Sequence, residues 1–501
     1  MTQSVGVASG PEALLRLAET LRIGDAVVSP CRPENLGDPE FRRSHGVKYA
    51  YAGGSMANGI SSVDMVEALA REGMLGFFGA AGLQPEPIEK AIDRLGGALD
   101  GLPWGCNLIN SPGEPNLEAA VVDLYLCRGI RLIEASAYLE LSLPLVRYRV
   151  MGLERRPSGE VASRNRVVAK VSRVEVATRF MSPPPESLLR ELVARGEISQ
   201  ETARMAEAVP VADDVTAEAD SGGHTDNRPA ITLLPTLLAL RDRLQEQYRF
   251  PRLVRVGAAG GIATPAAAAG AFAMGAAYVM TGSVNQACAE SGSSDAVRLM
   301  LAQAGQADVA MAPAADMFEM GVKVQVLKRG TMFAMRAARL YELYKTHDSL
   351  ESIPAAQREA LERDFFRAPC AEIWRQTREY FLKRDPAQAE RGERDAKHRM
   401  ALVFRCYLGQ ASRWANAGEP TRQVDYQVWC GPAMGAFNEW AKGSFLEEPR
   451  QRRVAVVALN LMVGAAYLTR VHNLRCQGVP VESPAAAFAP RDEEELRRII
   501  A

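Results

Sequence analysis

One of only five histidines in the chain, His224, follows a Gly-Gly pair at the end of a short apolar-alternating run. The two glycines, Gly222 and Gly223, let the backbone approach a flat ligand closely. A histidine on such a loop can donate a proton or polarise a carbonyl near neutral pH. The competing interpretation is a plain loop tip in which Asp226 and Asn227 serve as turn or cap residues. The pattern favours chemistry at His224.

Further along the chain, glycines follow two neighbouring apolar runs. The first run reads RLVRV from residue 252 and leads to Gly260 and Gly261, after which an Ala-rich helical stretch begins; the second ends at Thr281, Gly282 and Ser283. Small residues at the carboxyl ends of adjacent parallel strands leave backbone N–H groups free, and a helix N-terminus adds partial positive charge. Together they predict a phosphate site. The alternative for Ser283 is an ordinary N-cap.

The position of these turns predicts the fold. In a (β/α)8 barrel, the phosphate site commonly follows strands seven and eight, and function gathers at the carboxyl ends of the strands. Eight apolar runs precede helix-like segments, and the two glycine turns follow the last two. The runs are Tyr49–Ala52, Met74–Phe78, Trp104–Ile109, Ile130–Ala135, Val167–Val171, Val215–Ala219, Leu253–Ala258 and Tyr278–Thr281. We therefore expect an α/β protein built on a TIM barrel.

The unusual residues lie at the carboxyl ends of these runs. The other candidates at that face are Gly53, Gly54, Ser55 and Met56 after the first run, Asn107 within the third and Lys170 near the fifth. The alternative for Asn107 is an ordinary polar residue at a strand end. The alternative for Lys170 is an ion-pair partner that lines the barrel.

With 501 residues, the chain exceeds the usual barrel enough to imply an appendage. We expect a leader over residues 1–45 packed on the outside with a loop from Pro33 to Pro39, the barrel over 46–330, and an appended helical domain over 331–501. Within the barrel, a helical hairpin is expected at Glu186–Arg195 and Ser199–Ala208. The appended helices are expected at Met335–Tyr344, Ala355–Phe366, Ala371–Leu382 and Arg453–Leu468, where apolar residues recur at three and four spacing.

Composition excludes several classes of function. Lys plus Arg (59) nearly equals Asp plus Glu (60), so no global field recruits nucleic acid or a membrane surface. The eight cysteines form no metal-like cluster with histidine, and no signal peptide is recognised, which indicates a reducing cytoplasm. The apolar stretch Val454–Leu468 is interrupted by Asn460 and is too short to cross a bilayer.

Five stretches carry a resemblance to a known family. They are residues 218–229 (EADSGGHTDNRP), 256–262 (VGAAGGI), 281–286 (TGSVNQ), 312–321 (APAADMFEMG) and 429–438 (WCGPAMGAFN). The chain, from about residue 45 to about residue 470, resembles the PfaD family of flavin enoyl reductases, which act in trans with polyunsaturated fatty acid synthases and trans-acyltransferase polyketide synthases. The first three stretches also resemble flavin enoyl-acyl-carrier reductases and nitronate monooxygenases more widely.

The resemblance implies bound FMN, NADPH or NADH as hydride donor, and an enoyl thioester on an acyl carrier protein as substrate. It implies that the FMN phosphate lies on Gly260, Gly261, Gly282 and Ser283, that the ring lies against Gly53–Met56, and that Asn107 and Lys170 contact the flavin. His224 is then the catalytic residue, either as a hydrogen-bond donor to the thioester carbonyl or as a proton donor to the α-carbon. Asn285 and Gln286 are expected on the substrate side.

Some assignments stay open. The alternative function is a nitronate monooxygenase-type flavin oxidase with the same histidine as base, and a third reading is a docking protein without turnover. Cys288 is not expected to be a nucleophile, and Asp316 and Glu319 are read as a solvated turn or a structural ion pair, outside catalysis. Residues 429–438 either line a channel or form a packed turn. Arg450, Arg452 and Arg453 are a candidate landing site for the carrier protein. The oligomeric state is open, a homo-oligomer included.

Overall fold

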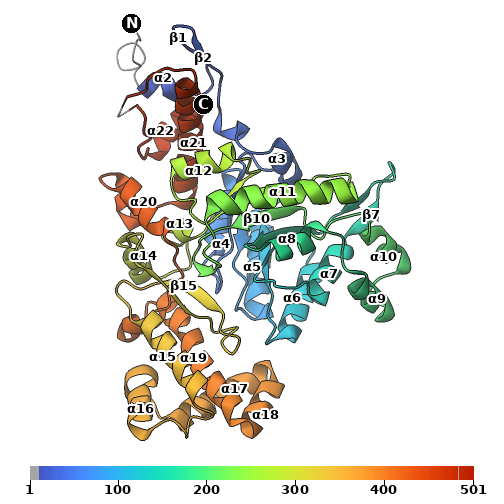
Figure 1. Ribbon diagram of the computed structural model, residues 1–501, viewed down its shortest axis with the longest axis vertical. Helices are drawn as coiled ribbons and strands as arrows, with labels where there is room; N and C mark the ends of the chain where they lie inside the picture. The colour runs from blue at the N-terminus through green and yellow to red at the C-terminus, as the bar shows by residue number, and fades with distance from the viewer. Residues whose placement is uncertain (1–10, 483–484) are drawn as a thin grey trace.

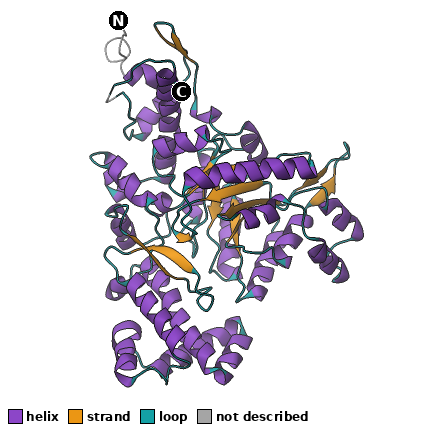
Figure 2. Ribbon diagram, in the orientation of Figure 1, coloured by secondary structure: helices purple, strands orange, loops and turns teal. Residues whose placement is uncertain are grey.

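The computed structural model describes residues 11–482 and 485–501, and its centre is a closed barrel of eight parallel strands (Figures 1 and 2). In order around the barrel they are β3 (Tyr51–Gly53), β4 (Leu75–Phe78), β5 (Gly105–Ile109), β6 (Leu132–Ser136), β9 (Arg166–Val171), β10 (Asp214–Glu218), β12 (Arg255–Ala259) and β13 (Val279–Thr281). Each lies on one of the eight apolar runs, so the TIM barrel is confirmed.

The strands are apolar because helices cover their outer face while side chains from opposite strands fill the inside. The helices that follow the strands are α4 (Val63–Arg71), α5 (Pro85–Ala98), α6 (Pro115–Cys127), α7 (Leu143–Val150), α8 (Val174–Met181), α11 (Ala230–Tyr248), α12 (Pro265–Ala273), α13 (Ser283–Gln286) and α14 (Asp295–Ala302). The expected hairpin is present as α9 (Glu186–Ala194) and α10 (Gln200–Ala206). A short antiparallel pair, β7 (Leu153–Arg155) and β8 (Val161–Ser163), was not predicted.

A buried charge cluster closes the amino end of the barrel. Asp214, the first residue of β10, accepts hydrogen bonds from Arg255 (2.6 and 2.8 Å) and lies 2.8 Å from His45 Nε2. Burial alone would raise the pKa of Asp214, but Arg255 and His45 outweigh it and hold that pKa well below its usual range. Because this end of a barrel serves stability, the cluster is structural.

A small antiparallel sheet lies over the opposite, carboxyl end. It consists of β11 (Gly223–His224), β15 (Lys323–Leu327) and β14 (Val309–Pro313). Gly223 pairs with Gln325, and His224 pairs with Val324. Its strands β14 and β15 lie beyond the eighth barrel strand and were not predicted. The sheet fixes the backbone of His224, which is therefore not a free loop tip.

The residues after β15 form two helical groups: the first lies at one end of the molecule, and the second runs from α20 (Ala433–Ala441), beside α14, to α21 (Val454–Cys476) and α22 (Glu493–Ile500) at the other end (Figure 1). The first group contains α15 (Phe333–Thr346), α16 (Ala355–Ala360) continued by a π-helical turn (Leu361–Phe366), α17 (Cys370–Arg384), α18 (Pro386–Arg394) and α19 (Ala396–Ala417). A 3-10 turn at Pro420–Asp425 packs on α19 and α15 of this group. The second group has the 3-10 turns Phe445–Glu447 and Pro449–Gln451 between α20 and α21. The C-terminal helical region is thus confirmed, while its boundary at residue 330 stays a prediction.

Helix α21 packs against barrel helix α12. The contact is close: a Cβ on Gly464 would lie 2.6 Å from Pro265. By length and composition α21 is the one described helix that could cross a membrane, but 83% of its most apolar window is buried inside the protein. It is a core helix that continues beyond the expected end at Leu468 as far as Cys476.

The N-terminal segment packs beside α21. It contains α2 (Pro11–Leu15), β1 (Leu21–Ile23), β2 (Ala26–Val28) and α3 (Pro39–His45), and the expected loop from Pro33 includes a 3-10 turn at Pro33–Asn35. The Gln477 side chain exchanges two hydrogen bonds of 2.9 Å with the backbone of Val27. The first ten residues of the expected leader lie outside the described residues.

Candidate active site

His224 faces the carboxylate of Asp316, a residue for which no catalytic role was expected. Its Nε2 lies 3.2 Å from Oδ2 of Asp316, which belongs to the connection between β14 and β15. Nε2 is buried and forms no hydrogen bond with the described residues, so its contact with Asp316 is an ion pair only, while the whole His224 side chain is 29% exposed. The other ring nitrogen, Nδ1, is therefore the one available to a ligand.

The pair changes the acidity of the imidazole. Burial disfavours the charged ring, but the negative charge of Asp316 outweighs burial and raises the pKa of His224. In turn, burial would raise the pKa of Asp316, but His224 outweighs it and lowers that pKa. The arrangement favours an imidazolium that can donate a proton from Nδ1 near neutral pH.

Arg405 fixes the segment that carries Asp316. Its Nε donates to the carbonyl of Ala315 (2.9 Å), and its Nη1 lies 3.2 Å from Glu319. Glu319 is thus the structural ion pair that was expected, and Asp316 lies in an exposed turn, as was also expected, but there it pairs with His224. Arg405 lies on α19. The helical group therefore contacts, through Arg405, the segment whose Asp316 faces the candidate catalytic histidine.

Lys170 forms ion pairs in the barrel, which was the alternative interpretation of this residue. Its Nζ lies 3.6 Å from Glu134 and 3.4 Å from Glu218, and its side chain is 13% exposed. Burial opposes the charge of Lys170, but both carboxylates outweigh burial and raise its pKa. Glu134, which is fully buried, also accepts hydrogen bonds from the Ser55 backbone N–H and hydroxyl. Lys170 is therefore a fixed cation in the cavity wall.

Asn107 is held by its neighbours at the end of β5. Its Nδ2 donates to the carbonyl of Glu134 (3.0 Å) and to the hydroxyl of Ser136 (2.9 Å). The side chain is 3% exposed and lines the cavity. This rigidity suits a residue that presents a polar atom to a flat ring.

The two glycine turns form a cradle. Gly260 and Gly261 have φ values of +78° and +80°, which glycine adopts without strain. A Cβ on Gly261 or on Gly282 would meet no atom within 4 Å, so both turns face open space. Thr264 caps α12 by accepting a hydrogen bond from Ala267 N–H. Ser283 is not an N-cap, because Gly282 holds that position and the Ser283 hydroxyl accepts from Gly431 N–H.

Most predicted site residues surround one continuous space. A cavity of about 410 Å³ contains His224, Gly223 and Asn107 in its wall, and an adjoining cavity of about 80 Å³ contains Gly54 and the two glycine turns with Thr281 and Ser283. The residues common to both are Ser55, Met56, Lys170, Glu218, Gly222, Gln286 and Trp429. The larger cavity also reaches α17 and α19, so the helical group forms part of its wall.

Two predicted residues do not line either cavity. Gly53 packs in the barrel, where a Cβ would lie 2.4 Å from Leu69. Asn285 is completely buried, where its side chain bonds with Tyr51 and with the carbonyl of Thr281. Gln286, by contrast, reaches both cavities.

Residues 429–438 close over the His224 turn. Trp429 bridges to Val326 of β15 and lines both cavities. A Cβ on Gly222 would lie 2.8 Å from Cys430 N, and a Cβ on Gly431 would lie 2.8 Å from Gly222 N. The stretch is therefore both a packed turn and part of the cavity wall, the two readings that the sequence left open. The two backbone segments can approach this closely because Gly222 and Gly431 have no side chain.

Other candidates are buried away from ligands. Cys288 is fully buried, and burial raises the pKa of its thiol, which fits its exclusion as a nucleophile. Arg452 cannot belong to the expected landing site, because it is 1% exposed and donates to the carbonyl of Leu446, whereas Arg450 and Arg453 are exposed and stay a prediction. Among the described residues, no cluster of three metal-ligating side chains is found.

Comparison with known proteins decides the family. Residues 43–362 match the model of the nitronate monooxygenase family, and residues 347–426 match the inserted helical domain of [acyl-carrier-protein] S-malonyltransferase. The chain belongs to the nitronate monooxygenase family. Proteins that are similar to it include the enoyl reductase domain of MlnA from the macrolactin cluster of Bacillus amyloliquefaciens, at 40% identity and a TM-score of 0.84 over 89% of this chain and 100% of that domain.

Two longer relatives are similar to the chain. One polyunsaturated fatty acid synthase protein of Thraustochytrium sp. is 48% identical over 92% of this chain and 31% of its own length. Polyketide biosynthesis protein PksE of Bacillus subtilis is 43% identical over 87% of this chain and 56% of its own length. The chain thus spans between about a third and just over half of these relatives. Within the nitronate monooxygenase family it falls in the PfaD-like enoyl reductase branch, and it is an oxidoreductase.

Proposed function

We propose that the protein reduces the α,β-double bond of enoyl thioesters carried on an acyl carrier protein, with FMN as cofactor and NADPH or NADH as hydride donor. The observation that carries the proposal is the continuous space that joins the glycine cradle to His224, Asn107 and Lys170. The full-length likeness to an enoyl reductase domain supports it.

The residues present fit FMN. Side chains on Gly261 or Gly282 would fill the cradle, so only glycine leaves room there for a phosphate beside the N-terminus of α12. The ammonium of Lys170, which Glu134 and Glu218 hold in place, lines both the cradle and the larger cavity, where it could donate a hydrogen bond to the polar edge of the flavin. When bound, the flavin accepts hydride from the nicotinamide and donates it to the β-carbon of the substrate.

The chain's own residues would stabilise the negative charge that develops on the substrate and would supply the proton that completes the reduction. Reduction at the β-carbon places negative charge on the thioester oxygen and the α-carbon. Nδ1–H of His224 can stabilise that charge and supply the proton to the α-carbon, while Asp316 holds the imidazolium from behind. Trp429 and residues of α17 and α19 complete the wall of this cavity.

The proposed partner is the acyl carrier protein of a polyketide or polyunsaturated fatty acid synthase, since the similar proteins belong to such synthases and biosynthetic clusters. The helical group adds support, because most of it matches a domain inserted in an enzyme that acts on acyl carrier protein. We place the activity in the cytoplasm. In the described part of the chain the eight cysteines form no disulfide, as a reducing compartment requires.

The test uses the purified flavoprotein without air. NADPH should bleach the flavin, and a crotonyl thioester on a carrier protein should restore the colour and yield a product heavier by two hydrogens. His224→Ala should keep the bleaching step and slow the thioester step by about a hundredfold or more, as expected for loss of a general acid. If only O₂ or a nitronate restores the colour, the oxidase alternative takes the place of the reductase.

A further inference from the structure

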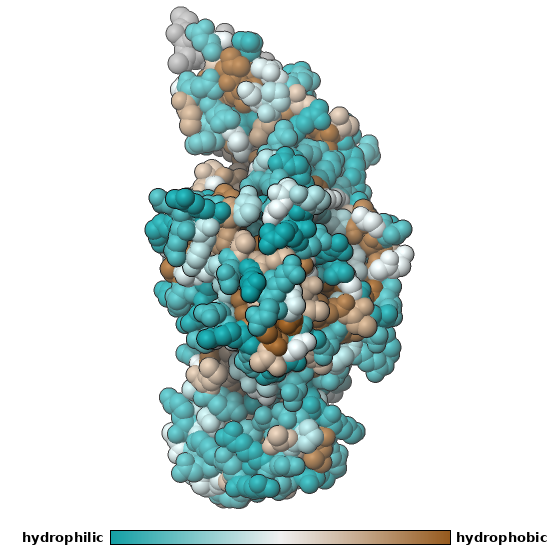
Figure 3. Space-filling model, turned by 90° about the vertical axis from the view of Figure 1, so that its right-hand side faces the viewer, coloured by the Kyte–Doolittle hydropathy of each residue, from teal (hydrophilic) through white to brown (hydrophobic). Residues whose placement is uncertain are grey.

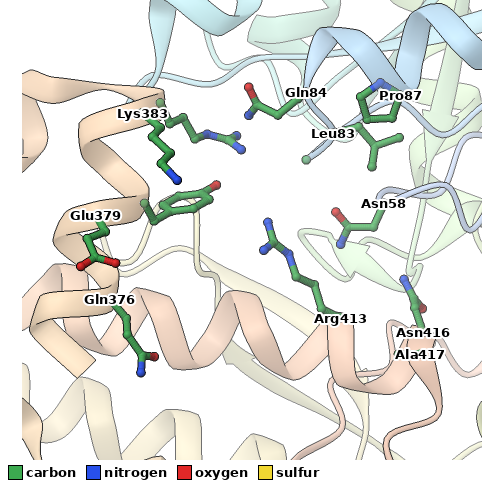
Figure 4. A pocket seen from close by; sticks show the side chains of 13 residues that line it. Asn58, Leu83, Gln84, Pro87, Gln376, Glu379, Lys383, Arg413, Asn416 and Ala417 are labelled. Atoms are coloured by element: carbon green, nitrogen blue, oxygen red, sulfur yellow. The ribbon is translucent and has the colours of Figure 1, made fainter. Parts of the chain in front are cut away.

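A wide opening lies at the outer end of the active-site cavity. It encloses about 840 Å³ between the barrel loop that leads into α5 and the helices α17 and α19 (Figure 4). The two spaces are continuous, because they share the lining residues Asn58, Gly82, Gln376, Tyr380, Arg384 and Arg413. A ligand that reaches His224 from this side must pass through the opening.

The opening carries uncompensated positive charge. Figure 4 shows the ammonium of Lys383, from α17, and the guanidinium of Arg413, from α19, directed into the same space, with Asn58 and Gln84 opposite. Neither cation has an ion pair or a side-chain hydrogen bond with any residue of 11–482 and 485–501. Arg413 only lies over the ring of Tyr380, at 5.8 Å.

The remaining charged residues of the lining already have ion-pair partners. Arg384 donates two hydrogen bonds of 2.7 Å to Glu114. Glu379 lies 2.6 Å from Arg375, which it shares with Glu372, and Figure 4 shows the Glu379 carboxylate turned away from the opening. Most of the surface of this helical group is hydrophilic (Figure 3). Several of its arginines pair with carboxylates, whereas Lys383 and Arg413 are two cations without an ion pair among the described residues that line one concave space.

We propose that Lys383 and Arg413 form a phosphate subsite, which holds the phosphate ester of a ligand whose reactive end lies in the active-site cavity. Two such cations, one compact and one with a planar fork of donors, suit the oxygens of a phosphate. This inference rests on the proposed function, in which two ligands carry that group: the 4′-phosphopantetheine arm of the carrier protein and NADPH.

The test measures binding without turnover. Calorimetry on the flavin-loaded protein compares 4′-phosphopantetheine, pantetheine without its phosphate, and NADP⁺, for the wild type, Lys383→Gln, Arg413→Gln and the double variant. Each single change should weaken 4′-phosphopantetheine about tenfold, the size of one exposed charge-assisted contact, and should leave pantetheine unchanged. Arg394→Gln, an exposed and unpaired arginine at the end of α18, is the matched control and should bind as the wild type does.

The outcomes separate the sources. A loss confined to NADP⁺ supports the phosphate subsite and assigns it to the hydride donor. Unchanged binding of both phosphorylated ligands by the double variant overturns the proposal. A wild-type protein that binds 4′-phosphopantetheine through these residues but reduces no enoyl thioester keeps the subsite and removes the proposed function. In a working enzyme, Lys383→Gln should raise KM for crotonyl-phosphopantetheine without changing kcat, and should leave KM for crotonyl-pantetheine unchanged.

Discussion

At the scale of single residues, the candidate site depends on which nitrogen of His224 is free. Asp316 occupies the side of Nε2, which leaves Nδ1 for the substrate and favours the charged ring. In other enzymes, too, a carboxylate beside a histidine stabilises the imidazolium that forms during the reaction. Asp316 is thus a positioning residue, since it acts through His224.

We expect Asp316→Asn to shift the pH dependence of the thioester step. Because the carboxylate raises the pKa of His224, its removal lowers that pKa, and the alkaline loss of activity should begin at lower pH. The rate at neutral pH should fall about tenfold to a hundredfold, less than the loss of the general acid itself, because His224 remains in place. Stopped-flow reoxidation of the flavin by a crotonyl thioester, over a pH range that spans the histidine titration, measures both effects.

A purely structural role for Asp316 predicts something else. It would change kcat or stability while the alkaline limb stayed in place. Glu319→Gln, three residues away and paired with Arg405, is the control: it should leave the limb at the wild-type position.

At the scale of elements, two glycines set how closely the His224 turn and residues 429–431 can approach. Gly222→Ala would place a methyl group 2.8 to 3.0 Å from the Cys430 backbone, so one segment must move. The loss of stability should be about 1–3 kcal/mol, as for overpacking elsewhere. Since a displacement of about 1 Å can cost a hundredfold in rate, kcat should fall more than stability implies.

The matched control is Gly96→Ala. Gly96 lies in α5, and a Cβ there would meet no atom within 4 Å. Alanine is favoured over glycine in a helix by about 1 kcal/mol, so this variant should be as stable as the wild type or more so, with unchanged kcat. Thermal unfolding and steady-state kinetics measure Tm and kcat for both variants. If Gly222→Ala and Gly96→Ala had the same Tm and kcat, the close contact between Gly222 and Cys430 would be contradicted.

The elements show what sequence reasoning can reach. The eight barrel strands were predictable because each is a short apolar run followed by a helix signal, and Gly260, Gly261 and His224 were predictable because they end such runs. Asp316 was missed because its partner lies far away in sequence, so spacing gave no signal. Gly431 lies in the motif at residues 429–438, so its importance could be predicted from the sequence. Its contact with Gly222 could not, because that contact depends on how the chain returns to the barrel after the helices.

At the scale of the whole molecule, the last segment completes the barrel's shell. Helix α21 covers α12, and most of its residues are fully buried. A chain that ends at residue 453 should be insoluble, because each buried Val or Leu contributes about 1.5–3 kcal/mol and net stabilities are only about 5–15 kcal/mol.

The comparison is a chain that ends at residue 491, which lacks α22 but keeps α21. It should remain in the soluble fraction after expression, with a lower Tm because Leu496 and the Arg497–Glu72 ion pair are lost. A soluble, flavin-binding chain ending at 453 would show that the barrel is complete without its C-terminal segment.

The α12–α21 contact also sets an order of events during synthesis. Helix α12 ends at Ala273 and α21 ends at Cys476. At a translation rate of roughly 5–20 residues per second, the ribosome needs on the order of ten to forty seconds to make the intervening chain. For that time the apolar surface of α12 has no partner, so the nascent protein is exposed to aggregation and is a natural client for ribosome-associated chaperones.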